Sequence, residues 1–339
     1  MAAMAAFAKY CRLVLVYNLA VILWGALVRA SGSGAGCGSH WPTCNGQVVP
    51  PKPSAATLIE YSHRLSSGLV LVLVAVLAIW AFRLVPRGHP IRLAATLAVA
   101  FTISEAAVGA GLVLFKLVAH DESLARALFV AAHLCNTLLL LAALAFAAHQ
   151  AGIEAAPPRA TPLPGGLANQ AHLTPLIGGL AAIMLLSATG AVAALGDTLF
   201  PAATLREGLA QDLSPTAHFL LRLRAFHPFL ALAAGAYLLY LCHRPLHPAT
   251  RPWANRVRLL VLAQWTLGPL NLLLLAPLLL QLAHLLLANL LWLALVFMSL
   301  SQWQASEGRL VHAPDGRAPV TWRSSEQEGE VVAEASRQM

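Results

Sequence analysis

Apolar residues gather in long runs separated by short polar segments, and this pattern dominates the chain. A membrane-spanning helix needs roughly 20 consecutive apolar residues. The pattern predicts eight such helices, at 13–30, 63–83, 93–114, 124–148, 173–195, 218–242, 257–276 and 279–302. The last two form one run, which we divide at Pro277 because proline favours a turn or kink. We therefore expect an all-α polytopic membrane protein. A cleaved signal peptide is an alternative for the first run, but no convincing cleavage signature follows it.

Composition and charge agree with a membrane protein and suggest its orientation. Hydrophobic residues make up 58% of the chain and charged residues 11%, outside the range of soluble domains. A net charge of +8 would suggest nucleic-acid binding in a soluble chain. Here the positive-inside rule explains the charge, so we expect membrane lipid and no nucleic acid as a partner. Basic residues cluster before the first run and in the second and sixth loops, at Lys9, Arg12, Arg83, Arg87, Arg92, Arg244, Arg251, Arg256 and Arg258. Both termini are therefore expected in the cytoplasm.

The chain reads as two similar four-helix units. Gly25-Ala26-Leu27-Val28 resembles Gly190-Ala191-Val192-Ala193, and Ala132-His133-Leu134 resembles Ala283-His284-Leu285. An even number of crossings per unit makes the copies parallel. We expect two pseudo-symmetric four-helix bundles, at 1–150 and 173–303. A cytoplasmic linker at 151–172 would join them, and a disordered cytoplasmic tail would occupy 304–339.

Four histidines lie near the starts of apolar segments, in two pairs: His63 with His133, and His227 with His284. An ionisable side chain inside lipid is costly and marks a candidate functional site. In the expected topology all four lie toward the outer leaflet, two in each half. Paired imidazoles between helices are typical axial ligands of haem. We therefore predict a bis-histidine haem site in each half; a hydrogen-bonded core histidine is the alternative for each.

One acidic residue distinguishes the two halves. Glu60 stands three residues before His63 and four before Arg64, on one helical face with both. The matching stretch 224–228 has no acid. A carboxylate beside only one site suggests chemistry there and electron transfer at the other. An acid near the helix N-terminus that pairs with Arg64 explains Glu60 equally well.

Two cysteines, Cys37 and Cys44, lie in the first outward loop, which is rich in Gly and also contains Pro42. An oxidising compartment permits a disulfide between them. A structural role is favoured over thiol–disulfide chemistry, and both stay open.

Three segments resemble the signature of the haem A synthase family: VRASGSGAGC at 28–37, WPTCNGQ at 41–47 and IEYSHR at 59–64. A fourth, ALGDTLFP at 194–201, is similar to a segment of bacterial members. The resemblance implies a bacterial inner (cytoplasmic) membrane enzyme with haem O as substrate. It implies that successive hydroxylations convert the C8 methyl group of haem O to a formyl group. The product, haem A, would serve terminal oxidases.

The resemblance also implies residue roles. His63 and His133 would flank the substrate haem, and His227 and His284 would be axial ligands of the iron of a haem b cofactor. Glu60 matches the family's essential glutamate, and Cys37–Cys44 matches its outer-loop disulfide. Arg64 and Arg29 lie where haem propionates would reach water; ordinary interfacial arginines are the alternative. Implied partners are haem O, haem O synthase and terminal oxidase assembly factors, and a homo-oligomer stays open.

Two features depart from the family pattern. The fifth loop lacks the second cysteine pair that many members carry, and Glu105 stands where members generally have glutamine. Glu105 is either a proton-path residue or an acid hydrogen-bonded to a neighbouring helix.

Two alternative functions would explain some of the same residues. A di-haem b-type membrane electron-transfer protein explains the four histidines but gives Glu60 and the cysteine loop no role. A transporter built from parallel repeats predicts broken helices and polar groups at the membrane midplane, for which the chain offers little.

Overall fold

The computed structural model describes residues 2–156 and 173–306. Within these ranges the chain forms helices joined by loops, and Cys44 and Gln47 form one isolated β-bridge. The helices are α1 (Ala2–Ala30), α2 (Ala55–Leu84), α3 (Pro90–Leu114), α4 (Leu124–Glu154), α5 (Leu173–Leu199), α6 (Leu205–Leu213), α7 (Phe219–His243), α8 (Arg251–Leu273) and α9 (Leu278–Ser306). Two short 3-10 turns, η1 (Ser33–Ala35) and η3 (Pro248–Thr250), complete the described elements.

Seven of these helices are long and apolar enough to cross a membrane: α1, α2, α3, α4, α5, α7 and α9. The multi-pass character expected from the sequence is therefore confirmed. The long helix α8 occupies the seventh predicted run but is not among the seven candidates; Arg256 and Arg258 near its start, with Gln264 and Asn271 further along, lower its mean hydropathy. Eight membrane crossings remain a prediction.

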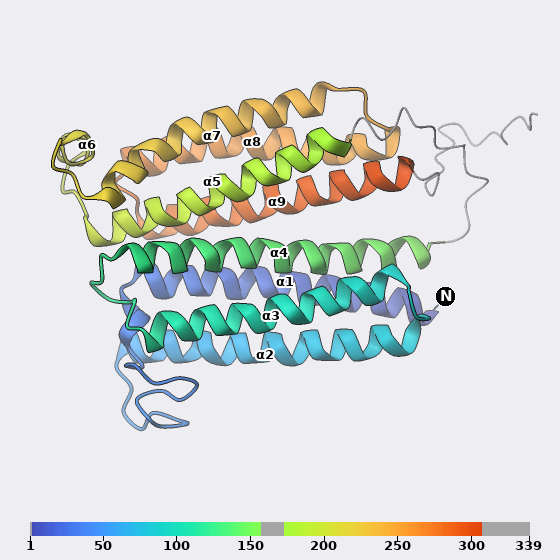
Figure 1. Ribbon diagram of the computed structural model, residues 1–339, viewed down its shortest axis with the longest axis horizontal. Helices are drawn as coiled ribbons and strands as arrows, with labels where there is room; N and C mark the ends of the chain where they lie inside the picture. The colour runs from blue at the N-terminus through green and yellow to red at the C-terminus, as the bar shows by residue number, and fades with distance from the viewer. Residues whose placement is uncertain (1, 157–172, 307–339) are drawn as a thin grey trace, which may run out of the picture.

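The long helices pack in two groups. Figure 1 shows α1–α4 as one group and α5, α7, α8 and α9 as the other, all nearly parallel to the long axis. Helix α4 contacts both α5 and α9, and α1 also contacts α9. A continuous apolar core runs through both groups, and its fully buried side chains include Leu141 and Leu144 of α4 and Leu295 of α9.

The two ends of the molecule differ in structure. The loop at 31–54 and α6 lie at one end, which we call the loop end (Figure 1). Ala2, where α1 begins, and Ser306, where α9 ends, lie at the opposite end. Helices α2, α4, α7 and α9 therefore all begin at the loop end, which is the relative direction expected from the sequence.

Helix boundaries depart from the predicted runs in three ways. Helix α1 begins 11 residues before the predicted residue 13, and α2 begins eight residues before residue 63. Helix α6 is not predicted by the apolar pattern. Helices α4 and α9 continue into the predicted linker and tail, to Glu154 and Ser306, while 157–172 and 307–339 of those segments lie outside the described residues.

Candidate functional site

The four histidines occupy matched depths in four helices that begin at the loop end. His63, His133, His227 and His284 stand eight, nine, eight and six residues after the first residues of α2, α4, α7 and α9. At about 1.5 Å of rise per residue, these depths differ by no more than about 5 Å. The helix starts place His63 about two turns inside α2, rather than at its first residue as the apolar run suggested.

Each histidine faces a glycine on the long helix that precedes its own. The pairs are Gly25–His63, Gly109–His133, Gly190–His227 and Gly268–His284. In the first pair of each half the contact is tight, because a Cβ on the glycine would lie 3.0 Å and 2.9 Å, respectively, from the imidazole. In the second pair of each half the same distances are 3.9 Å and 3.6 Å. The arrangement of glycine and imidazole is thus repeated in both halves.

The imidazoles also pair within each half. His63 and His133 lie within electrostatic range of each other, as do His227 and His284. The Nδ1 atoms of His63 and His284 are buried with no hydrogen-bond partner, whereas Nδ1 of His133 lies 3.1 Å from Oε1 of Glu105 and Nδ1 of His227 lies 3.1 Å from Oγ1 of Thr189. Within the described ranges, no three or more His, Cys, Asp or Glu side chains form a cluster that could hold a bare metal ion.

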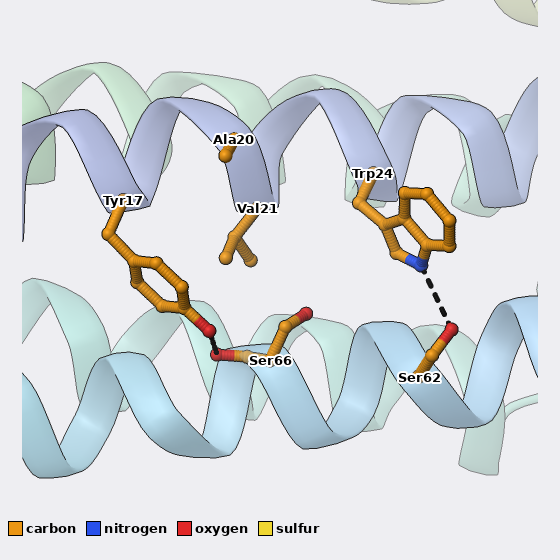
Figure 2. Close-up of a pocket in the computed structure, with 6 residues that line it drawn as sticks. All are labelled: Tyr17, Ala20, Val21, Trp24, Ser62 and Ser66. Carbon is orange, nitrogen blue, oxygen red and sulfur yellow. Dashed lines mark hydrogen bonds between the residues drawn. The ribbon is translucent and has the colours of Figure 1, made fainter.

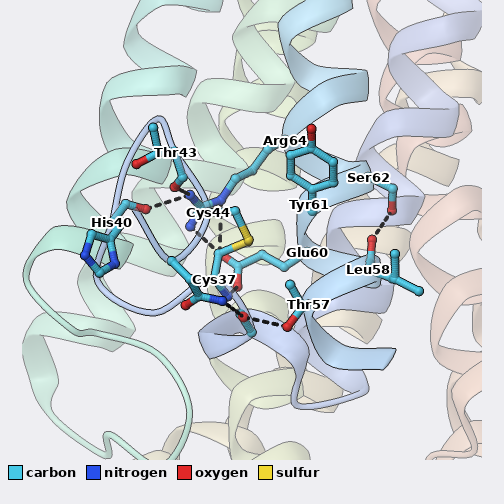
Figure 3. The surroundings of a disulfide bond; sticks show 12 residues. Cys37, His40, Thr43, Cys44, Thr57, Leu58, Glu60, Tyr61, Ser62 and Arg64 are labelled. Atoms are coloured by element: carbon cyan, nitrogen blue, oxygen red, sulfur yellow. Dashed lines mark hydrogen bonds and ion pairs between the residues drawn. A yellow bond between two sulfur atoms is a disulfide. The ribbon is translucent and has the colours of Figure 1, made fainter. Parts of the chain in front are cut away.

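Glu60 joins the start of α2 to the cysteine loop (Figure 3). Its carboxylate is only 4% exposed. Oε2 accepts a hydrogen bond of 2.8 Å from the backbone N–H of Cys37, and Oε1 pairs with the guanidinium of Arg64 at 2.5 Å. Arg64 also donates from Nη1 to the carbonyls of His40, at 2.6 Å, and Thr43, at 2.7 Å. The pairing of Glu60 with Arg64, one of the two sequence interpretations, is present, and the same two side chains hold the loop.

Cys37 and Cys44 form a disulfide, as expected from the sequence (Figure 3). Both cysteines are fully buried. The loop packs directly on the first turn of α2, where Oγ1 of Thr57 donates to the carbonyl of Gly36 at 2.8 Å. A Cβ on Gly36 would lie 2.5 Å from the carbonyl of Ala56, so this close approach requires glycine. Burial of both sulfurs favours a structural role for the disulfide.

The second half has its own charged cluster near its first histidine. Arg224, three residues before His227, pairs with Asp212 at 2.6 Å and with Asp197 at 3.0 Å. Arg224 therefore stands where Glu60 stands relative to His63, with the opposite charge. The sequence stretch 224–228 indicated no acid here, because Asp197 belongs to α5 and Asp212 to α6.

Arg29 and Arg64 have different hydrogen-bond partners. From the end of α1, Nη1 of Arg29 donates to the carbonyl of Ala194 and to Oγ1 of Thr198 on α5, both at 2.6 Å. Its Nη2 donates to Oε1 of Gln281 on α9 at 3.2 Å. Arg29 thus links the two helix groups at the loop end.

Two surface pockets lie at equivalent places in the two halves. One, of about 280 Å³, opens between α1 and α2, and the other, of about 260 Å³, opens between α5 and α7. Both pockets are lined by the residues that stand 8, 5 and 4 positions before the tight glycine of the same half, Gly25 or Gly190. These residues are Tyr17, Ala20 and Val21 in the first pocket, and Ala182, Leu185 and Leu186 in the second. Figure 2 shows Trp24 and Ser62 in the lining of the first pocket, where Nε1 of Trp24 donates to the hydroxyl of Ser62 at 3.1 Å. The α1–α2 pocket is the more polar of the two.

A comparison with known protein families identifies the family of this chain. The sequence profile of the cytochrome oxidase assembly protein family COX15-CtaA matches residues 8–57 and 52–296. The chain belongs to this family. The predicted family resemblance is therefore confirmed, and the match covers all four histidines, both cysteines and Glu60.

Individual relatives carry two different names. A protein of Thermus thermophilus named protoheme IX farnesyltransferase is 43% identical over 329 residues, which are 93% of this chain and 52% of that protein. Heme A synthase of Halalkalibacterium halodurans is 43% identical over 126 residues, 37% of this chain and 42% of the relative. Heme A synthase of Alkalihalophilus pseudofirmus is 45% identical over 97 residues, 29% and 33% of the two chains. The chain spans about half the length, or less, of these curated relatives.

Proposed function

We propose that this chain is a haem A synthase, an oxidoreductase that converts the C8 methyl group of haem O to a formyl group. Two successive hydroxylations of the methyl group, each a two-electron oxidation that requires an external oxidant and a source of one oxygen atom, give a gem-diol, which loses water to leave the aldehyde. Family membership and the relatives named heme A synthase support this class of reaction. The observation that carries the proposal is the repeated pair of histidines with a glutamate, Glu60, three residues before the first histidine of only one half, where the other half has Arg224.

The proposal assigns one haem to each half. His63 and His133 would hold the substrate haem O, and His227 and His284 would hold a haem b cofactor. Paired imidazoles, each facing a glycine on the preceding long helix, fit haem in both places. Arg64 would lie near the propionates of the substrate haem, with its guanidinium held by Glu60 and the loop.

The proposed architecture is two pseudo-symmetric four-helix bundles in a bacterial inner membrane. Residues 1–150 would form the substrate half and 173–303 the haem b half, with the linker, the tail and both termini in the cytoplasm. The common position of Ala2 and Ser306 at the end opposite the disulfide loop supports this topology (Figure 1). The two equivalent pockets support the repeat.

The proposed partners follow from the reaction. Haem O must be supplied by an enzyme that adds a farnesyl group to protohaem, and haem A must be passed to terminal oxidase assembly. The name of the Thermus thermophilus relative supports the first of these links. The family description, cytochrome oxidase assembly protein, supports the second.

The chain's own residues supply orientation and electrostatics, while bound haem supplies the redox chemistry. Glu60 is proposed to act at the C8 methyl as an acid/base group or as a stabiliser of developing positive charge. Because both its oxygens are already engaged, by Arg64 and by the N–H of Cys37, the stabilising role fits better. The buried disulfide loop would keep Glu60 in place and water away from it.

Haem analysis separates this function from the di-haem electron-transfer alternative. Protein purified from cells that also make haem O should yield, on extraction and mass analysis, haem B together with haem O, its alcohol or haem A. His227→Ala should remove the low-spin haem b signal, and His63→Ala should remove the substrate haem while haem b stays. Two equivalents of haem B, despite available haem O, would contradict the synthase and favour the electron-transfer protein.

The role of Glu60 has its own test. Glu60→Gln keeps the side-chain volume and an acceptor for Cys37 but removes the charge. Conversion of haem O should fall by about 10²-fold or more, since loss of one stabilising group costs about that much. The haem b spectrum should not change. Glu207→Gln, an exposed substitution on α6, is the matched control. Unchanged haem A output from Glu60→Gln would remove Glu60 from the chemistry.

A further inference from the structure

We propose that Glu105 is a positioning residue for His133 and sets the electronic character of this ligand toward the substrate haem. Oε1 of Glu105 on α3 lies 3.1 Å from Nδ1 of His133 on α4. The two side chains come from adjacent helices that pack together, and the 3.1 Å separation is within ion-pair distance. The inference rests on the proposed function, because it requires haem at His133.

The carboxylate of Glu105 is held in place by side chains next to His133. Nδ2 of Asn136 donates to Oε2 at 2.5 Å, and Oγ1 of Thr137 donates to Oε1. Asn136 and Thr137 follow His133 by three and four residues, so all three side chains share one face of α4. Asn136 is itself fixed to α3, through the carbonyl of Phe101 at 2.9 Å and the hydroxyl of Ser104 at 2.6 Å. This network presents a fixed acceptor to the imidazole.

The second half has a neutral amide, and no carboxylate, at the equivalent place. Gln264 stands four residues before Gly268, as Glu105 stands four residues before Gly109. Gln264 donates from Nε2 to the backbone carbonyl of His284 at 3.1 Å. Of the four histidines, all within the described ranges, only His133 has a carboxylate within ion-pair distance. The difference separates the proposed substrate site from the proposed haem b site.

An acceptor at Nδ1 has two consequences for a ligand histidine. It fixes the tautomer with the proton on Nδ1, which leaves Nε2 free to bind iron. A carboxylate also makes the imidazole a stronger electron donor than a neutral partner does. Stronger donation favours ferric over ferrous iron, so Glu105 would lower the reduction potential of the haem at His133. Glu105 thereby gives the substrate haem a more electron-rich ligand than haem b has.

The test is a redox titration of the purified protein with haem in both halves. At a fixed applied potential, Glu105→Gln should lower the ferric-to-ferrous ratio of the haem at His133 about tenfold. For a one-electron couple, this change corresponds to a rise of about 59 mV in the reduction potential of that haem. The haem b potential should stay as in the wild type. Gln264→Ala, at the equivalent place in the second half, is the matched control and should leave the haem at His133 unchanged.

The outcomes separate this inference from the proposed function. If the Glu105→Gln variant binds both haems and the reduction potential of the haem at His133 is unchanged, the proposed role of Glu105 is wrong, while the proposed function still stands. Loss of the haem at His133 with haem b retained would support it, since the ligand would have lost its orienting group. If Glu105→Gln does not fold, Thr137→Val removes one donor to the carboxylate and should shift the potential in the same direction. If His133→Ala retains both haems, no haem sits at His133 and the proposed function itself fails.

Discussion

At the residue scale, the four glycines decide how closely each imidazole approaches the neighbouring helix. The contact is tight at His63 and His227, the first histidine of each half, and looser at His133 and His284. One imidazole of each pair thus lies close against the neighbouring helix, while the other has room to adjust. In the proposed haem sites, one histidine would be fixed and the other adaptable.

This difference predicts opposite effects for two chemically identical substitutions. Gly25→Ala places a methyl group 3.0 Å from the His63 ring, so the imidazole must move, at a cost of about 1–3 kcal/mol in stability. Gly109→Ala places it at an ordinary 3.9 Å from His133 and should be neutral, or stabilising by up to about 1 kcal/mol through helix propensity. Occupancy of the first-half haem, measured by extraction, should fall only in Gly25→Ala.

The second half offers the same comparison independently. Gly190→Ala should broaden or shift the low-spin haem b spectrum, and Gly268→Ala should not, since their Cβ distances are 2.9 Å and 3.6 Å. Equal behaviour of the tight and loose variants in both halves would show that the glycines do not position the imidazoles.

The residue-scale chemistry is only partly readable from the sequence. The histidines stand out because ionisable groups are rare in apolar runs, and Glu60 stands out because it shares a helical face with His63. The partners of Arg224 do not stand out in the sequence. Asp197 and Asp212 are 27 and 12 residues away from Arg224 along the chain, and they contact it only in the folded protein. Glu105 is recognisable as an acid within a helix, but its contact with His133 depends on how α3 and α4 pack.

At the element scale, hydropathy locates the apolar part of a helix but not its ends. Helix α2 begins at Ala55, capped by Ser54 whose hydroxyl accepts from the N–H of Thr57, eight residues before the apolar run starts. Helix α6 is short and polar, so no apolar run marks it. A local signal is present, however, because the hydroxyl of Thr204 caps its start by accepting from the N–H of Glu207, and the carboxylate of Glu207 accepts from the N–H of Ala203. The order and relative direction of the long helices follow from the pattern, whereas polar helix ends require capping signals.

At the scale of the whole molecule, polar contacts join the two helix groups at three levels. Arg29 links α1 to α5 and α9 at the loop end. In the middle, Nε1 of Trp292 on α9 donates to the carbonyl of Leu138 on α4 at 2.7 Å. Toward the opposite end, Nε2 of His149 on α4 lies 3.0 Å from Oε1 of Gln304 on α9. Since lipid provides little hydrophobic drive between helices, such contacts contribute specificity as well as stability.

The contact at the loop end is the most readily tested, because Arg29 forms three hydrogen bonds across the interface. Arg29→Met keeps much of the apolar stem and removes these bonds. It should lower the free energy of unfolding by about 1.5–3 kcal/mol, the range for hydrogen bonds to charged groups. Detergent-titrated unfolding should report this loss, while the haem b spectrum at room temperature should persist because His227 and His284 lie on α7 and α9. Arg222→Met is the control, since Arg222 donates to Pro215 within its own half. If the two variants unfold alike, Arg29 does not hold the halves together, and apolar packing between α4 and α9 must account for the interface.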